Sequence, residues 1–262
     1  MRQVTTRVIA VANQKGGVGK TTTAVNLSAC LAALGRRVLL FDLDPQANAT
    51  SGVGVEKVDG ASAYRVLLGE GLLSEKIQRT AFEGLDLIPS EVDLCGVDFE
   101  LARAENHLQR VTEVLRPVRQ SRNYDVVIID CPPSLGVLTL NAFTASTGVL
   151  VPLQCEYFAL EGISMLNRVM NQLHDTGINP HLELLGVVMT MYDGRTRLSQ
   201  QVVGEVREHF KEKVFETMIP RSTRLAEAPS FGKPILYYDK YNTGSAAYEL
   251  LSQEVLDRLK LD

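Results

Sequence analysis

The chain has 262 residues, of which 45% are hydrophobic and 22% are charged, and its formal net charge is −4. This composition is typical of a globular domain, and no apolar run approaches the roughly 20 residues that a membrane-spanning helix needs. The first residues are polar and lead directly into a strand-like run, so we expect no signal peptide and a cytoplasmic location. The length is sufficient for one large domain, and we expect residues 1–262 to form it.

Short β-branched runs alternate with longer helical patterns along the chain. The expected strands cover residues 8–12, 38–42, 85–89, 126–130, 148–152 and 184–191. The expected helices cover residues 21–34, 100–118, 138–144, 161–174, 198–210 and 246–259. Each strand is apolar on both faces, as in a parallel sheet that helices cover on both sides. The pattern predicts an α/β fold with a doubly wound, mostly parallel sheet flanked by helices.

A glycine-rich loop, NQKGGVGKTTT over residues 13–23, connects the first expected strand to the first expected helix. This order of strand, loop and helix is the context of a phosphate-binding loop. The glycines leave room for backbone N–H groups to turn toward phosphate oxygens, and the helix N-terminus adds partial positive charge. We expect Lys20 to pair with the β- and γ-phosphates of ATP, and the Thr21 hydroxyl to ligate Mg²⁺.

The loop departs from the standard spacing G-x-x-x-x-G-K-[ST] at its first position. Gln14 stands where the first glycine would be, and a second lysine, Lys15, precedes the glycine pair. Lys15 could be an exposed loop cation without a role. A lysine beside the phosphates would also offset the charge that develops as the terminal phosphate bond breaks.

Two carboxylates stand at and just beyond the end of the second expected strand. The carboxyl ends of parallel strands line the ligand crevice, so Asp42 and Asp44 both arrive near the phosphates. Hydrolysis needs a group that orients the attacking water, and the family resemblance described below implies that Asp44 is this group. The alternative for Asp44 is an Asx turn before Pro45, and the two roles can coexist. For Asp42 we favour hydrogen bonds within the loop.

The expected strand over residues 126–130 is hydrophobic and ends in Asp130. This arrangement delivers one carboxylate toward the Mg²⁺ shell, usually through a metal-bound water. Cys131, Pro132 and Pro133 follow, and two prolines in succession make a stiff loop suited to reporting the state of the γ-phosphate.

The segment KGGVGKTT over residues 15–22 resembles the deviant Walker A motif of the ParA/MinD superfamily. The similarity covers nearly the whole chain, and residues 190–196 and 219–234 resemble the ParA/Soj branch. It implies a P-loop ATPase in which Lys15 reaches across a dimer to the partner's nucleotide and acts in catalysis with Lys20 and Asp44. The resemblance also implies that Pro220 contacts the adenine of the nucleotide. The residues assigned to the nucleotide are Lys15, Gly16, Gly17, Val18, Gly19, Lys20, Thr21, Thr22 and Pro220, and those assigned to the metal are Thr21 and Asp130.

The resemblance also implies partners. An ATP-bound homodimer would bind double-stranded DNA without sequence preference, in association with the nucleoid, and a ParB/Spo0J-type centromere-binding protein would stimulate hydrolysis. Arg195, Arg221 and Arg224 match the family's basic positions, and residues 195–240 hold nine Lys/Arg against six Asp/Glu. These arginines could instead pair with acidic neighbours, namely Glu205, Glu208 and Glu227. Because the first expected strand begins at residue 8, we expect no N-terminal helix-turn-helix domain.

Three other functions remain open. A MinD-like membrane-positioning ATPase would need a basic amphipathic C-terminal helix, but residues 248–262 carry four acidic and two basic side chains, so we expect no membrane partner. A nitrogenase-type iron protein would need two suitably placed cysteines, for which Cys95 and Cys131 are the candidates. We expect these two and the remaining cysteines, Cys30 and Cys155, to be small buried side chains. A small-molecule kinase would need a lid and an acceptor pocket that the sequence does not reveal.

Overall fold

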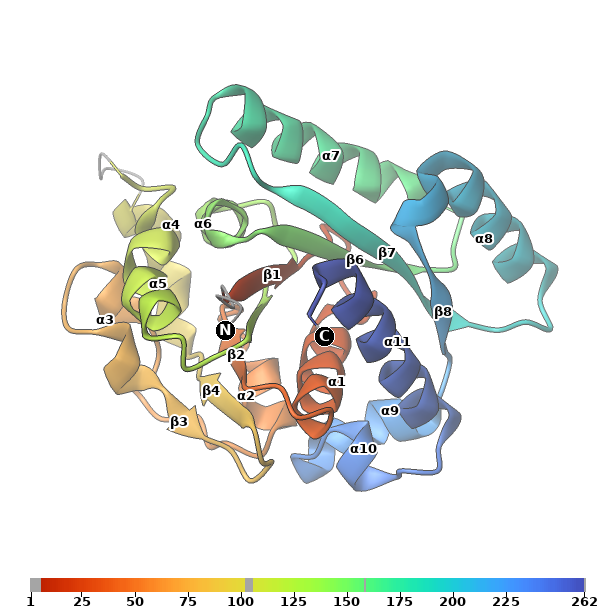
Figure 1. Cartoon of the computed structure of the whole chain (residues 1–262), viewed down its shortest axis with the longest axis horizontal. Helices are drawn as coiled ribbons and strands as arrows, with labels where there is room; N and C mark the ends of the chain where they lie inside the picture. Colours follow the sequence, from red (N-terminus) through yellow and green to blue (C-terminus); the bar gives the residue numbers. More distant parts are fainter. Residues whose placement is uncertain (1–5, 102–105, 158, 262) are drawn as a thin grey trace.

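A computed structural model describes residues 6–101, 106–157 and 159–261, and within these ranges one eight-stranded sheet lies between two layers of helices (Figure 1). The strands stand in the order β3-β4-β2-β5-β1-β6-β7-β8, and every neighbouring pair is parallel except β3 with β4. The strands are β1 (Arg7–Val11), β2 (Val38–Asp42), β3 (Gln78–Arg79), β4 (Leu85–Ile88), β5 (Val126–Asp130), β6 (Gly148–Gln154), β7 (Glu183–Tyr192) and β8 (Val214–Pro220).

The helices divide between the two faces of the sheet. The α-helices are α1 (Lys20–Ala33), α2 (Asn48–Gly52), α3 (Tyr64–Leu67), α4 (Val97–Leu101), α5 (Arg110–Ser121), α6 (Val137–Ala145), α7 (Ala159–Asp175), α8 (Arg197–Phe210), α9 (Thr223–Glu227), α10 (Ile235–Tyr238) and α11 (Thr243–Leu259). Short 3-10 helices are η1 (Leu73–Lys76), η2 (Val92–Gly96), η3 (Lys211–Lys213) and η4 (Ala228–Phe231). The core under α5, α6 and α7 takes Val8 and Ala10 from β1, whereas the core under α1 and α11 takes Ile9 and Val11. Strands that bury both faces explain the continuous apolar runs of the sequence.

The predicted fold class is confirmed, and all six expected strands are present. The prediction missed β3 and β8. β3 has two residues and is the antiparallel edge. β8 is the opposite edge, where Glu216 is exposed, so the strand lacks the two apolar faces that identified the others.

The single helix expected over residues 100–118 was wrong. α4 ends at Leu101, α5 begins at Arg110, and residues 102–105 lie outside the described part of the chain. Side chains of α6 explain the interruption, because Asn141 donates to the His107 carbonyl at 2.6 Å and Thr144 donates to the Leu108 carbonyl at 2.5 Å. These carbonyls are satisfied by α6 rather than by the next turn of a continuous helix.

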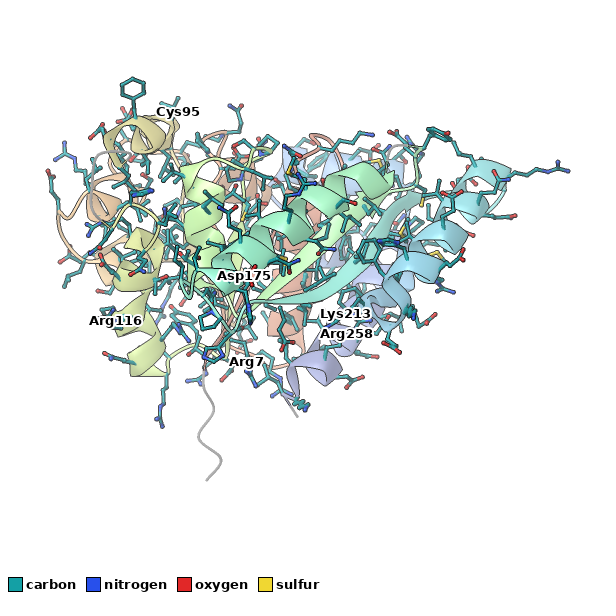
Figure 2. The ribbon with its side chains drawn as sticks, turned by 90° about the horizontal axis from the view of Figure 1, so that it is seen from above. Arg7, Cys95, Arg116, Asp175, Lys213 and Arg258 are labelled. Carbon is teal, nitrogen blue, oxygen red and sulfur yellow. The ribbon has the colours of Figure 1, made fainter. Side chains whose placement is uncertain are left out.

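The C-terminal helix α11 is anchored on the sheet. Tyr248, Leu251 and Val255 are buried in the core under α1. The Arg258 guanidinium stacks 3.8 Å from the centre of the Phe215 ring and donates to the Leu185, Lys213 and Val214 carbonyls. Figure 2 shows Arg258 beside Lys213. Among the described helices, none is long and apolar enough to cross a membrane.

Candidate nucleotide site

The phosphate loop between β1 and α1 exposes its backbone at two positions that favour glycine. Gly17 and Gly19 have φ angles of 75° and 88°, which residues with a Cβ rarely adopt. A Cβ placed at Gly16 or Gly17 would meet no atom within 4 Å, so the loop faces open space. The backbone N–H groups of this segment are therefore accessible to an anion at the N-terminus of α1.

Lys20 is buried beneath this loop. Its Nζ donates to the Lys15 carbonyl at 2.9 Å, which holds the ammonium inside the turn of the loop. Burial lowers the pKa of Lys20, and the neighbouring carboxylates of Asp130 and Asp44 partly oppose that shift. The ammonium can bind phosphate oxygens through charge-assisted hydrogen bonds, and a divalent cation would offset the repulsion between those oxygens and the two carboxylates.

Lys15 turns away from the same loop. Its backbone N–H donates to the Asn13 side chain at 3.0 Å, and Asn13 donates in turn to the Pro152 carbonyl at 2.8 Å. The Lys15 ammonium forms an ion pair with Glu156 in the segment after β6, and both side chains are nearly half exposed. The two lysines thus occupy different environments: the Lys20 ammonium bonds the chain's own phosphate loop, and the Lys15 ammonium lies at the molecular surface.

The carboxylates of β2 and β5 lie side by side, because Asp42 and Asp130 are partners in the sheet register. Asp42 accepts hydrogen bonds from the Thr50 N–H and hydroxyl, both at 2.7 Å, and from the Asp44 N–H at 3.3 Å. The structure thus confirms the expected loop hydrogen bonds of Asp42. Burial raises the pKa of Asp42 to about 6, although the bonds from Thr50 act in the opposite direction.

Asp130 lacks comparable partners. Both of its carboxylate oxygens are buried, and neither accepts a hydrogen bond of normal geometry from the described residues, although the Thr21 hydroxyl is close enough to oppose its pKa shift. Burial, with the added repulsion from Asp42, raises the pKa of Asp130 well above its usual range. An orphaned buried carboxylate next to a threonine hydroxyl fits a hydrated Mg²⁺, because a divalent cation would stabilise the charged carboxylate.

Asp44 follows β2 and is almost completely buried. Its Oδ1 atom accepts the Gln46 N–H at 3.0 Å, so the Asx turn considered from the sequence is present. The same carboxylate acts electrostatically on Lys20. Turn formation and an electrostatic effect on the loop lysine thus coexist at this residue.

A pocket of about 220 Å³ continues from the phosphate loop toward the ends of β7 and β8. Pro220, Gly19 and Thr22 all lie in its wall. Sequence reasoning missed the rest of its lining, which includes Thr190, Met191, Ser222, Leu225 and Tyr248. The Thr190 hydroxyl ties this pocket to the phosphate loop by donating to the Val18 carbonyl at 2.8 Å. These residues carry no local motif, since strand ends far apart in sequence bring them together.

Of the three candidate DNA-contact arginines, Arg221 lines this pocket, and Arg195 and Arg224 lie on the segments that follow β7 and β8. Arg195 is 89% exposed and bonds Asp193 through two donors, at 2.9 and 2.8 Å. Hydrogen bonding from Arg195 lowers the pKa of Asp193 to about 2, and the charge of Arg221 adds to the effect. Arg224 bonds Glu227 at 3.0 Å, as the alternative interpretation expected for that pair. Exposed ion pairs of this kind contribute little to stability and can exchange one anion for another.

The cysteines do not form a plausible cluster site. Cys131 is buried, and its thiol lies 3.8 Å from the Ile129 carbonyl in the core. Cys95 is exposed, which corrects the expectation that all four cysteines are buried. A cluster shared by two copies would need both thiols at one surface.

Comparisons with known proteins agree with this site. A family model described as an AAA domain matches residues 6–184. The chromosome partitioning protein ParA of Caulobacter vibrioides is 51% identical over 253 residues, which are 96% of this chain and 94% of that protein. The chromosome-partitioning ATPase Soj of Thermus thermophilus is 51% identical over 260 residues, which are 99% of each protein. A crystal structure of cobyrinic acid a,c-diamide synthase from Mycobacterium smegmatis with bound ADP and magnesium is similar, with a TM-score of 0.84, 39% identity and coverage of 98% of this chain and 96% of that one. The chain therefore belongs to the ParA/Soj family of chromosome-partitioning ATPases.

Proposed function

We propose that this chain is an ATP-timed DNA-segregation switch. Mg-ATP joins two copies face to face, the dimer binds double-stranded DNA without sequence preference, and hydrolysis releases it. A ParB/Spo0J-type centromere-binding protein stimulates the hydrolysis step. The observation that supports this proposal best is the second loop lysine, because Lys15 lies at the molecular surface while Lys20 already serves the chain's own loop.

Each site residue has a distinct role in this scheme. The loop amides and Lys20 bind the β- and γ-phosphates, and Pro220 contacts the adenine from the wall of the adjoining pocket. Thr21 and Asp130 hold Mg²⁺, whose chemistry here is to neutralise phosphate charge. Asp44 orients the attacking water from the end of β2.

Lys15 completes the site of the second copy. In the single chain its ammonium pairs with Glu156 at the surface, a contact of low energy that can be given up. A γ-phosphate presented by the partner offers a stronger, charge-assisted interaction. When Lys15 leaves Glu156 and binds the γ-phosphate of the partner's ATP, the two chains become joined. ADP has no γ-phosphate, so association depends on ATP.

The DNA surface is the basic region near the nucleotide pocket. Arg195, Arg221 and Arg224 lie on the segments after β7 and β8, and dimerisation doubles their number on one particle. Phosphate contacts release counterions, so affinity for DNA gains from each added arginine and falls steeply with salt. Nucleoid association follows from this contact.

The structure gives the membrane-positioning alternative little support. The buried face of α11 is packed in the core, and two of its charged residues bond the protein itself: Arg258 bonds three carbonyls and Glu254 accepts the Glu216 and Thr217 N–H groups. A helix that binds anionic lipid must present an apolar face with basic flanks.

The most direct test is co-sedimentation of the purified chain with DNA in ATP, in ADP and without nucleotide, beside vesicles of anionic phospholipid. We expect DNA binding in Mg-ATP alone and no binding to the vesicles. Binding to vesicles in ATP would favour the membrane-positioning function instead. Equal DNA binding in all three nucleotide states would contradict the switch.

Replacement of Arg195, Arg221 and Arg224 by glutamate should weaken DNA binding in ATP and reduce its dependence on salt. The slope of log affinity against log salt should fall by about 0.9 for each DNA phosphate that the variant no longer neutralises. A matched control reverses the same number of charges at Arg116, Arg119 and Arg122 at the end of α5, which leads into the start of β5, whereas the three candidate arginines follow the carboxyl ends of β7 and β8. If the control variant loses DNA binding and the first variant keeps it, the DNA surface lies at α5.

A further inference from the structure

A closed ring of buried hydrogen bonds surrounds the backbone of Asp44. The Asp42 carboxylate accepts the Asp44 N–H at 3.3 Å and the Thr50 hydroxyl at 2.7 Å. The Thr50 hydroxyl oxygen accepts the Ser90 N–H at 2.9 Å, and the Ser90 hydroxyl donates to the Asp44 carbonyl at 2.6 Å. Ring members come from four segments: the end of β2, the loop that follows it, α2, and the loop after β4.

Because its members are buried, this ring of hydrogen bonds stabilises one conformation of the loop after β2. Asp42 and Thr50 are 0% exposed, Ser90 is 1% exposed and Asp44 is 6% exposed. A polar group that loses its partner in such a place is not compensated by water, so the cost of opening the ring is high. The loop is therefore held by both the N–H and the C=O of Asp44, whose carboxylate acts electrostatically on Lys20.

Ser90 is the one ring member supplied from outside the segment that runs from β2 through α2. It lies two residues after the end of β4, 46 residues from Asp44 and 40 residues from Thr50. Its neighbour Glu91 accepts the Gly60 N–H at 2.5 Å and the Ser62 hydroxyl, so the same turn of chain also fastens the loop after α2. The turn after β4 thus acts as a fixed support for the whole segment between β2 and α3.

We propose that Ser90 is a positioning residue for ATP hydrolysis, which aims the Asp44 carboxylate by holding the Asp44 carbonyl. This inference rests on the proposed role of Asp44 in orienting water. Ser90 is outside the phosphate loop and does not line the pocket that contains Pro220. It therefore acts on the geometry of the reacting water rather than on nucleotide affinity. A small displacement of a water-orienting group is enough to slow a reaction severalfold.

Ser90→Ala removes the hydroxyl and retains the N–H that bonds Thr50. We expect kcat for phosphate release from Mg-ATP to fall about five- to tenfold, while KM for ATP stays within about twofold. The matched control is Ser62→Ala, because Ser62 is also 1% exposed and its hydroxyl bonds Glu91 in the same region without touching Asp44. Its kcat should stay within about twofold of the parent chain, and thermal unfolding of both variants checks that the losses of stability are similar.

A double variant separates positioning from general damage. In single-turnover measurements, Ser90→Ala should add no further loss to an Asp44→Ala chain, because Ser90 acts through Asp44. Equal losses of kcat in the Ser90 and Ser62 variants, or additive losses in the double variant, would overturn the inference. If Asp44→Ala alone hydrolyses ATP at the parent rate, the proposed role of Asp44 fails; if it is inactive and Ser90→Ala is unchanged, the Ser90 inference alone fails.

Discussion

Asp44→Ala is expected to reduce ATP turnover by about 100-fold or more while nucleotide still binds. The reason is positional. The hydrogen-bond ring uses the backbone N–H and C=O of Asp44, so truncation of its side chain leaves the loop anchored and removes the carboxylate that orients water. Lys20 and the loop amides that bind the phosphates are untouched. The dimer should therefore accumulate on DNA in ATP, which phosphate release and DNA co-sedimentation would measure together.

Asp44→Asn is the control for this prediction. The amide oxygen of asparagine can still accept the Gln46 N–H, so the Asx turn survives while the negative charge is lost. A turnover defect close to that of Asp44→Ala assigns the residue to hydrolysis. Parent-like turnover in the asparagine variant would assign it to the turn.

Lys15→Ala and Lys15→Gln should abolish ATP-induced dimerisation and leave nucleotide binding measurable. Both contacts of Lys15 within the phosphate loop are made by its backbone: its carbonyl accepts Lys20 and its N–H donates to Asn13. The side chain contributes only the surface pair with Glu156 among the described contacts. Light scattering of the chain in Mg-ATP, beside titration with a fluorescent ATP analogue, would measure the two properties separately.

Two companion variants define what the lysine does. Lys20→Ala removes the buried cation of the chain's own site and should lose nucleotide binding itself. Glu156→Gln removes the competing anion from Lys15 and should permit dimerisation at the same or a lower ATP concentration. A normal ATP dimer formed by Lys15→Ala would place the dimer contact elsewhere.

Much of the fold could be predicted because its signals are local. β1, β2 and β5 are buried on both faces and therefore appear as continuous apolar runs. The edge strand β8 was missed because an exposed Glu216 interrupts that pattern. The break between α4 and α5 was missed because α6 causes it, through Asn141 and Thr144, and no residue near the break reports those contacts.

The sequence by itself determined the phosphate loop, the order of six of the eight strands along the chain, and the acidic residues at two strand ends. These features lie within single stretches of a few residues, where backbone preference and side-chain chemistry act together. Tertiary structure alone decided the surface pair of Lys15 with Glu156, the pocket between the phosphate loop and the ends of β7 and β8, and the ring that joins Ser90 to Asp44. The hydrogen bonds and the ion pair at these places connect residues 40 to 172 positions apart, and parallel strands bring them together because their carboxyl ends meet at one edge of the sheet.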